Sequence, residues 1–341
     1  MLNARHHAWG HSMRDRIFAT ILQLFVFATL FAVPGSAQTA TDGWSTPRTP
    51  DGRPDLQGVW TNATITPFER GNTMPYSGVA FPESAADKPF FTEEEGARLE
   101  AQTVAGRPGV LGAYNVWMDA GNRLLSTRQT SLVVDPSDGR VPVKAWAASA
   151  REHDISRQRD EYDAMSTWDR CITRGVPGSM LPTGYNNAYR IVQTPDVVAI
   201  QYEMIHDVRV IPVTASAHAD ENVELWMGDA RAHWDGDTLV VDTTNFNDQT
   251  MIVTSSRDGR LKGLPVGDAM HVVERFTRVS EDEIMWEVTV DDPDVYDRPW
   301  TLSMPLTRAS DYVMYEYACH EGNQDVAIYL GGGRAEEVAG R

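Results

Sequence analysis

The segment Arg231–Asp242, with the sequence RAHWDGDTLVVD, decides the fold because its pattern is typical of a β-hairpin. Its Asp235-Gly236 pair tolerates the positive φ angles that a two-residue hairpin turn requires. A second hairpin follows, in which Met270–Val279 and Glu283–Val290 flank a short polar turn. Consecutive hairpins with little helical signal between them indicate an antiparallel meander. Such a meander tends to close or stack, and its interior can then hold a small molecule.

Working outward from these hairpins, the alternation and turn residues predict further strands before and after them. They are Asp55–Trp60, Thr130–Asp135, Tyr189–Gln193, Val197–Met204, Val208–Val213, Arg231–Trp234, Asp237–Thr244, Trp300–Leu306 and Val313–Ala318. A capping box at Thr92–Glu95 predicts a helix to about Thr103, and Glu152–Thr167 is a second helical candidate. The predicted fold is therefore mainly β: an antiparallel lipocalin-like β-barrel or meander, with an irregular N-terminal region that carries one or two helices.

The first residues have the pattern of a secretory signal peptide. A basic segment at Met13–Arg16 precedes the apolar run Ile17–Val33, and small residues end at Ala37. We expect a signal peptide over residues 1–37, with a retained N-terminal anchor as the alternative. The rest divides into an extended and helical region over 38–170, packed on the barrel, and a β-barrel-like domain over 171–341. This organisation predicts a soluble periplasmic or secreted protein with no membrane span after signal removal.

The formal charge of −18 is strongly acidic for 341 residues. An acidic surface repels nucleic acid and anionic lipid, so neither is an expected partner. The expected partner is a small-molecule substrate or ligand, and the sequence does not determine the oligomeric state.

Cys171 and Cys319 are the two cysteines of the chain. An isolated pair in an oxidising compartment is most simply a disulfide, and two free thiols or a metal site are the alternatives. The bond would close a circuit of about 150 residues, which the chain-entropy model values at about 4 to 5 kcal/mol.

Several longer motifs carry a family resemblance: DLQGVW at 55–60, CITRGVPGSMLP at 171–182, GYNN at 184–187, EMIHD at 203–207 and YEYACHEGN at 315–323. Together they resemble a family of exported bacterial proteins that has no assigned reaction. The resemblance covers nearly the whole chain after the signal peptide. A weaker resemblance, carried by Gly58-Val-Trp60 and the meander, is to lipocalin-like proteins, including enzymes of the carotenoid-hydratase type.

His206 is a candidate catalytic residue because strand alternation places it on the face of Val198, Ile200, Tyr202 and Met204. At the mouth of a barrel its imidazole can transfer protons, oriented by Asp207 or Tyr202. The alternatives are a core histidine with satisfied hydrogen bonds, and an ordinary ion pair of Asp207 and Glu203 with Arg209 at a solvated rim.

His320 and Glu321 form a second candidate pair, beside the expected disulfide at the end of the last predicted strand. A turn capped around Gly322 is the alternative. The loop residues Tyr185, Asn186 and Asn187 would approach them through the disulfide and contact the substrate. Further substrate-binding candidates are Tyr202, Trp226 as a stacking surface, and Arg231 as an anion-binding fork. Trp226 has a core position as its alternative.

The sequence contains no dinucleotide fingerprint, phosphate loop or nucleophile elbow, so we expect no organic cofactor. No two histidines have a local metal-ligand spacing, so no metal site is assigned, although a metal ion bound by His206, His320, Glu321 and Asp207 stays open. The leading hypothesis is a cofactor-free enzyme, a hydrolase or lyase, with histidine and carboxylate acid–base chemistry on a small, partly apolar molecule. The alternatives are a non-catalytic carrier of an apolar ligand and a metal-dependent hydrolase or oxidase.

Overall fold

A computed structural model describes residues 44–72, 79–110 and 118–340. The expected signal peptide over residues 1–37 lies outside the described residues. In the described ranges, no helix combines the length and the apolar character that crossing a membrane requires.

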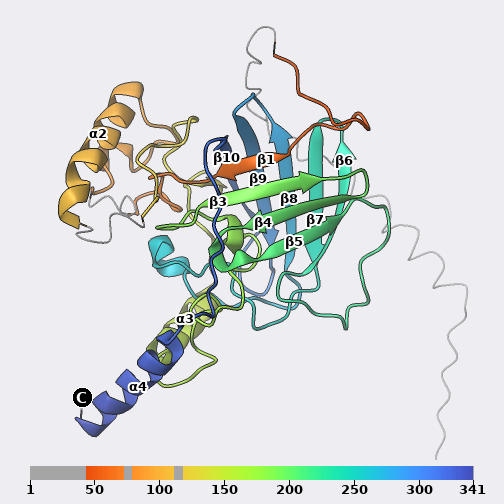
Figure 1. The fold of residues 1–341 in the computed structure, drawn as a ribbon. Helices are drawn as coiled ribbons and strands as arrows, with labels where there is room; N and C mark the ends of the chain where they lie inside the picture. Colours follow the sequence, from red (N-terminus) through yellow and green to blue (C-terminus); the bar gives the residue numbers. More distant parts are fainter. Residues whose placement is uncertain (1–43, 73–78, 111–117, 341) are drawn as a thin grey trace, which may run out of the picture. The chain divides into compact units, whose positions relative to one another are not determined.

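The fold is mainly antiparallel β, as predicted, and its sheet contains ten strands (Figure 1). Nine of them follow the order β5-β4-β3-β1-β10-β9-β8-β7-β6, and β2 pairs with β10 beside this path. Their bounds are β1 Gly58–Thr61, β2 Val133–Asp135, β3 Ala188–Gln193, β4 Val197–Tyr202, β5 Val208–Pro212, β6 Asp229–Asp235, β7 Thr238–Thr244, β8 His271–Arg278, β9 Glu283–Asp291 and β10 Trp300–Arg308.

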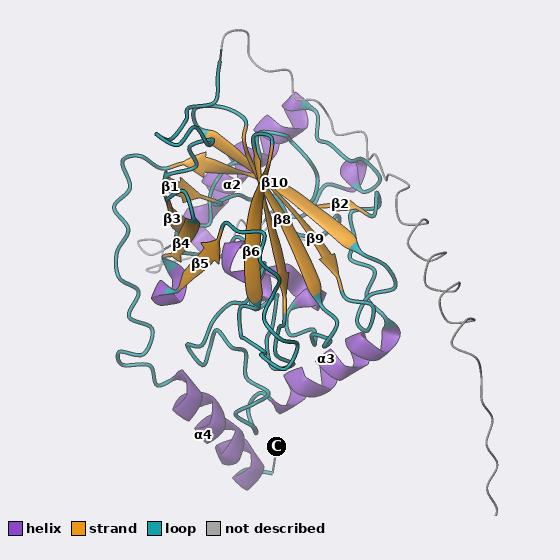
Figure 2. Ribbon diagram, turned by 90° about the vertical axis from the view of Figure 1, so that its right-hand side faces the viewer, coloured by secondary structure: helices purple, strands orange, loops and turns teal. Residues whose placement is uncertain are grey.

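The two end strands of this sheet approach one another and nearly close a barrel. A parallel bridge joins Val213, directly after β5, to Ala232 of β6, and the backbone N–H of Thr214 donates to the Ala232 carbonyl at 2.9 Å. Figure 1 shows β1, β3, β4 and β5 in front of β6 to β10, and the main core cluster contains buried residues from both groups. Figure 2 shows the same strands from the side.

Strands from both sides of the expected boundary at residue 170 build the barrel. β1 lies between β3 and β10, with Trp60 opposite Tyr189 on one side and Arg308 on the other. The N-terminal region therefore supplies a central strand of the sheet.

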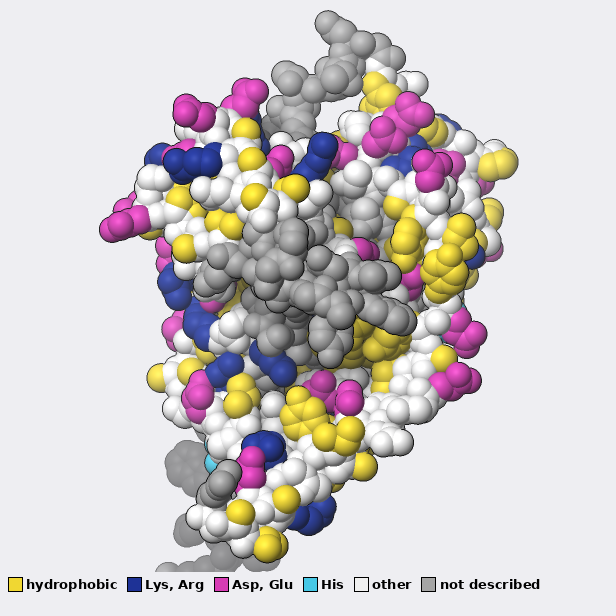
Figure 3. Space-filling model, turned by 60° about the vertical axis from the view of Figure 1, so that its left-hand side comes forward, with side chains coloured by type: hydrophobic (Ala, Val, Ile, Leu, Met, Phe, Trp, Pro, Cys, Tyr) yellow, Lys and Arg dark blue, Asp and Glu magenta, His cyan; other side chains and the backbone are white. Residues whose placement is uncertain are grey.

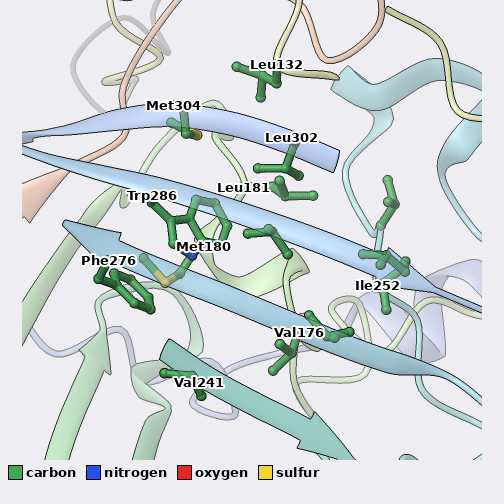
Figure 4. Packing of buried hydrophobic residues seen from close by; sticks show 14 of the residues in the cluster. Leu132, Val176, Met180, Leu181, Val241, Ile252, Phe276, Trp286, Leu302 and Met304 are labelled. Carbon is green, nitrogen blue, oxygen red and sulfur yellow. The ribbon is translucent and has the colours of Figure 1, made fainter. Parts of the chain in front are cut away.

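Strict alternation fills the barrel interior with side chains. Every second residue of β8, from Val272 to Arg278, is buried, and β9 repeats the pattern from Ile284 to Val290. The rings of Phe276 and Trp286 lie 6.3 Å apart inside this core (Figure 4). Large aromatic and aliphatic groups thus occupy the space that the sequence predicted as a ligand cavity.

The hairpin that decided the fold is present, with its turn displaced by one residue. Asp235 pairs with Thr238, so the two turn residues are Gly236 and Asp237, and Gly236 has φ +59°. A glycine at the first central position is the requirement of a type II′ turn.

Three described α-helices accompany the sheet: α2 Glu93–Val110, α3 Ala145–Arg157 and α4 Asp325–Val338. The capping box at the start of α2 is confirmed, because the Glu95 N–H donates to the Thr92 hydroxyl and the Thr92 N–H donates to the Glu95 carboxylate. α2 continues past the expected end at Thr103. α3 begins and ends earlier than the predicted segment Glu152–Thr167. Short 3₁₀ turns lie at Glu83–Ala85, Gly178–Met180, Met204–His206 and Ser256–Leu261.

Two predictions of local structure were wrong. Val313–Ala318 does not form a strand, and this segment instead runs without regular structure toward the disulfide. β4 ends at Tyr202, because the 3₁₀ turn Met204–His206 breaks the alternation that was extended to His206. As a result His206 is exposed, while Arg209, predicted at a solvated rim, is 5 % exposed and faces the barrel core.

Candidate functional site

The Cys171–Cys319 disulfide is present, with the two sulfurs 2.05 Å and the two Cα atoms 5.7 Å apart. It joins the loop after Trp168 to the C-terminal segment, 148 positions away in sequence. Asn323 reinforces the junction, since its Nδ2 donates to the Asp169 carbonyl at 3.3 Å and contacts the Cys171 sulfur at 2.9 Å.

An open pocket of about 340 Å³ lies beside this disulfide. Its lining combines aromatic, acidic and carboxamide side chains from both joined segments: Trp168, Asp169, Cys171, Tyr185, Tyr317, Cys319, Glu321, Gly322, Asn323, Gln324 and Asp325. Tyr185 and Glu321, predicted to approach one another through the disulfide, therefore share one pocket. His320 is exposed and is not part of the lining.

The C-terminal segment also contacts a buried carboxyl group, through Tyr312 and Tyr315. Glu203 follows β4 and is 0 % exposed. Its Oε1 accepts a hydrogen bond from the Tyr312 hydroxyl at 2.8 Å and another from the backbone N–H of Tyr315 at 3.2 Å. Its Oε2 is also buried and finds no hydrogen-bond partner within the described part of the chain.

A second carboxyl group, that of Asp119, lies near Glu203. Asn187 holds it: the side-chain Nδ2 donates to Asp119 Oδ1 at 2.8 Å, and the backbone N–H lies 3.4 Å from Oδ2. Burial raises the pKa of Asp119, and the negative charge of Glu203 raises it further, against the opposing hydrogen bonds from Asn187. Two carboxyl groups in one poorly solvated place cannot both ionise easily.

Tyr312 completes the group and connects it to solvent, because its side chain is 38 % exposed. Burial of the hydroxyl and its hydrogen bond to Glu203 raise the pKa of Tyr312. We call Asp119, Glu203 and Tyr312 the carboxyl–phenol cluster. Titratable side chains that combine a strongly shifted pKa with a charged partner are concentrated at functional sites.

The backbone next to Glu203 is strained. Ile205 has φ +65° and His206 has φ +61°, two consecutive non-glycine residues in the left-handed region. For a β-branched residue this conformation is a genuine outlier, and such strain concentrates at functional sites. The turn is what directs Glu203 inward and His206 outward.

The other predicted site residues are dispersed. Asp207 is half-buried and accepts from the Thr173 hydroxyl at 3.1 Å. Asn186 is half-buried with φ +52°, and Asn187 positions Asp119. Trp226 and Arg231 do not line the pocket beside the disulfide, and Arg231 is paired with Asp229.

Tyr202 belongs to a buried polar cluster inside the barrel. There Arg209 binds Glu274 Oε2 at 2.5 Å and the Thr243 hydroxyl at 2.7 Å, and Trp286 donates to Glu274 Oε1 at 3.2 Å. Burial raises the pKa of Tyr202. These groups contact one another and are enclosed in the barrel, so Tyr202 is part of the core.

Sequence reasoning missed a histidine–carboxylate cluster on β6, β7 and β8. The ring nitrogens of His218 lie 3.1 Å from Asp229 and 2.9 Å from Asp242, and His271 Nε2 lies 2.8 Å from the other oxygen of Asp242. No local spacing predicts the cluster, because His218 lies outside the strands and meets Asp229 and Asp242 only in the folded sheet. The cluster fastens the loop that carries His218 to the sheet.

Acidic and basic side chains are both distributed over the face of the molecule that Figure 3 shows. Within the described ranges, no group of three or more His, Cys, Asp or Glu side chains is arranged to hold a metal ion. Comparisons with models of known families, with curated proteins and with solved structures find no match for this chain.

Proposed function

We propose that this protein is an exported acid–base enzyme, a hydrolase or lyase, that acts on a small, partly apolar molecule without an organic cofactor. The observation that carries the proposal is the fully buried Glu203. One of its oxygens has no hydrogen-bond partner among the described residues, and the other is bonded to a half-exposed phenol. The disulfide supports export, because such bonds persist in oxidising compartments.

Each member of the carboxyl–phenol cluster has a role that its surroundings favour. Asp119 retains its proton to higher pH than an ordinary aspartate and is suited to donate it. Tyr312 stands between solvent and Glu203, so its oxygen can take a proton from the substrate while its own proton passes to Glu203 Oε1. Asn187 holds Asp119 in position.

An elimination shows how the protons balance. The Tyr312 oxygen accepts the proton from the substrate carbon, and the electron pair of that bond forms the new double bond as the leaving hydroxyl departs. Asp119 gives its proton to that hydroxyl, which leaves as water. The proton on Glu203 returns to solvent through Tyr312, and solvent reprotonates Asp119. Hydration follows these steps in the reverse order. Hydrolysis uses Tyr312 and Asp119 in the same roles, with water as the molecule that loses the proton.

This assignment replaces the imidazoles with carboxyl groups as the proposed proton carriers. His206 and His320 are both exposed, and within the described residues neither imidazole forms a hydrogen bond with the carboxyl or phenol groups of the cluster, although the His206 backbone N–H donates to the Glu203 carbonyl at 3.2 Å. A catalytic role for either histidine is the competing proposal, which the same experiment tests.

The test is a screen of purified protein against aryl esters, lactones, β-hydroxy carbonyl compounds and aromatic alkenes. On any substrate that is turned over, Tyr312→Phe, Glu203→Gln and Asp119→Asn should each lower kcat by about 100-fold or more, the scale of general acid–base catalysis. The matched control is Tyr315→Phe, since the side chain of Tyr315 is 71 % exposed and only its backbone contacts Glu203.

The outcomes separate the proposals. Full activity in Tyr312→Phe and Glu203→Gln, with loss in His206→Gln or His320→Gln, would favour the histidines. Absence of turnover by the wild-type protein across all four substrate classes would count against an enzyme. Urea unfolding of each variant shows whether a loss reflects chemistry or folding.

A non-catalytic carrier is the second candidate, and the open pocket beside the disulfide favours it. A carrier would bind its ligand in this pocket, because buried side chains occupy the barrel interior. Ligand binding without turnover would support this function.

A further inference from the structure

We propose that the pocket beside the Cys171–Cys319 disulfide is a binding site for a small organic cation, such as a substituted amine or a quaternary ammonium ion. The proposal does not depend on the carboxyl–phenol cluster, because it concerns different side chains and is measured by binding alone.

Aromatic rings form one wall of the pocket. The ring of Tyr185 lies between those of Trp168 and Tyr317, with centroid distances of 6.1 and 6.2 Å. The electron-rich face of an aromatic ring attracts a cation within about 6 Å of its centroid. One cation–π contact already involves a lining residue, since the buried Arg174 guanidinium lies 5.1 Å from the ring centroid of Trp168.

The charged side chains that line the pocket itself are all acidic. Asp169, Glu321 and Asp325 line it, and its lining contains no lysine, arginine or histidine. Asp169 is half-buried, whereas Glu321 and Asp325 are exposed. Carboxylates beside aromatic faces favour a cation that also has apolar surface, and they oppose an anion of the same size.

The pocket is held open before any ligand arrives. The disulfide covalently joins two segments that line the pocket, and Asn323 bridges them through its bond to the Asp169 carbonyl. The backbone N–H of Asp325 in turn donates to Asn323 Oδ1 at 2.9 Å, which orients the start of α4. A preformed site loses less conformational entropy on binding, and its volume of about 340 Å³ lies in the range of small-molecule pockets.

The experiment measures binding of benzyltrimethylammonium and of choline to the full chain by calorimetry and by tryptophan fluorescence. The control ligand is the uncharged isostere of choline, in which a tert-butyl group replaces the trimethylammonium group. We expect both cations to bind, and choline to bind about tenfold or more tightly than its isostere. Tyr317→Leu and Glu321→Gln should each weaken cation binding several-fold.

The matched control variant is Tyr315→Leu, which removes an exposed tyrosine from the same segment but outside the pocket lining. Equal affinity for choline and its isostere would overturn the proposal, as would tighter binding of benzoate or no binding of either cation at millimolar concentration. Weakening by Tyr315→Leu equal to that by Tyr317→Leu would also overturn it. Cation binding without turnover would leave this site standing while the proposed enzyme failed.

Discussion

Arg209 and Glu274 form an ion pair inside the barrel, with the arginine Nη1 2.5 Å from the carboxylate Oε2. Their side chains are 4 % and 1 % exposed. Burial alone would lower the pKa of Arg209, but the charge of Glu274 and the contact with Tyr202 outweigh burial and raise it. The guanidinium of Arg209 therefore remains charged although its side chain is buried.

Removing one partner of this pair should be severely destabilising. Arg209→Met leaves Glu274 buried without its counter-charge, and we expect a loss of about 3 to 5 kcal/mol in the free energy of unfolding. Arg209→Met combined with Glu274→Leu should cost less than the sum of the two single changes, because no unpaired charge remains. Urea unfolding of the three variants measures both quantities.

The control for this experiment is the exposed pair Arg275–Asp235, whose side chains are 41 % and 63 % exposed. Asp235→Asn should cost less than about 1 kcal/mol, the value typical of surface ion pairs. Equal costs for Arg209→Met and Asp235→Asn would contradict the buried-pair interpretation.

The fold could be predicted largely because side-chain alternation and turn residues are local signals. The two hairpins β6–β7 and β8–β9 were located to within one or two residues, and the pairing of Cys171 with Cys319 followed from their isolation. The helix α4 was not predicted: its glycines at 331–333 lower the helical propensity of the segment.

The candidate site was harder to predict because it depends on a single turn. The left-handed conformations of Ile205 and His206 shift every later residue to the opposite face, so alternation placed His206 inside and Arg209 outside. The loop residue Asn187 holds Asp119 near Glu203, and no local pattern in the sequence predicts a contact between residues as far apart as Asp119 and Asn187.

The capping box should make the stability of α2 depend on pH in the acid range. The backbone N–H of Thr92 and the ammonium of Lys88 lower the pKa of Glu95 to about 2. A depressed pKa stabilises the folded state above the ordinary pKa of about 4.5, and this contribution disappears as the pH falls through about 2. The protection factors of the α2 amides against hydrogen exchange, which are measured relative to the intrinsic rate at each pH, should therefore fall over this interval.

Glu95→Gln should lack this acid-dependent change. Glu93→Gln, at a neighbouring position whose side chain is 93 % exposed, should retain it. Identical profiles for Glu95→Gln and the wild type would show that the capping contact does not control the start of α2.

The raised pKa of Asp119 predicts the opposite dependence on pH. The folded protein holds the Asp119 proton more tightly than the unfolded chain does, because burial opposes ionisation and Glu203 adds to this. The resulting stabilisation is complete below the ordinary aspartate pKa of 3.8, and it is lost as the pH rises through the folded value. Relative to Asp119→Asn, the wild type should therefore lose stability as the pH increases.

Urea unfolding of the wild type and Asp119→Asn at a series of pH values measures this difference. Asp119→Asn also lacks one acceptor oxygen, which changes its free energy of unfolding by an amount that does not vary with pH. The informative quantity is therefore the slope, against pH, of the difference in unfolding free energy between the two proteins. A difference that grows in favour of the wild type with rising pH would mean that Asp119 is held as a carboxylate, and its role as proton donor would be wrong.

The disulfide should contribute to stability and to the pocket in ways that can be separated. It closes a loop of 148 positions, for which the chain-entropy model gives about 5 kcal/mol. The double variant Cys171→Ser, Cys319→Ser should lose stability of this order in urea unfolding, and the reducing agent that destabilises the wild type should leave the variant unchanged. Asn323→Ala keeps the covalent bond but removes the contact with Asp169, so it should cost less stability while still loosening the pocket. If the double variant unfolds at the same urea concentration as the wild type, other contacts fix the C-terminal segment, and the disulfide does not organise this side of the molecule.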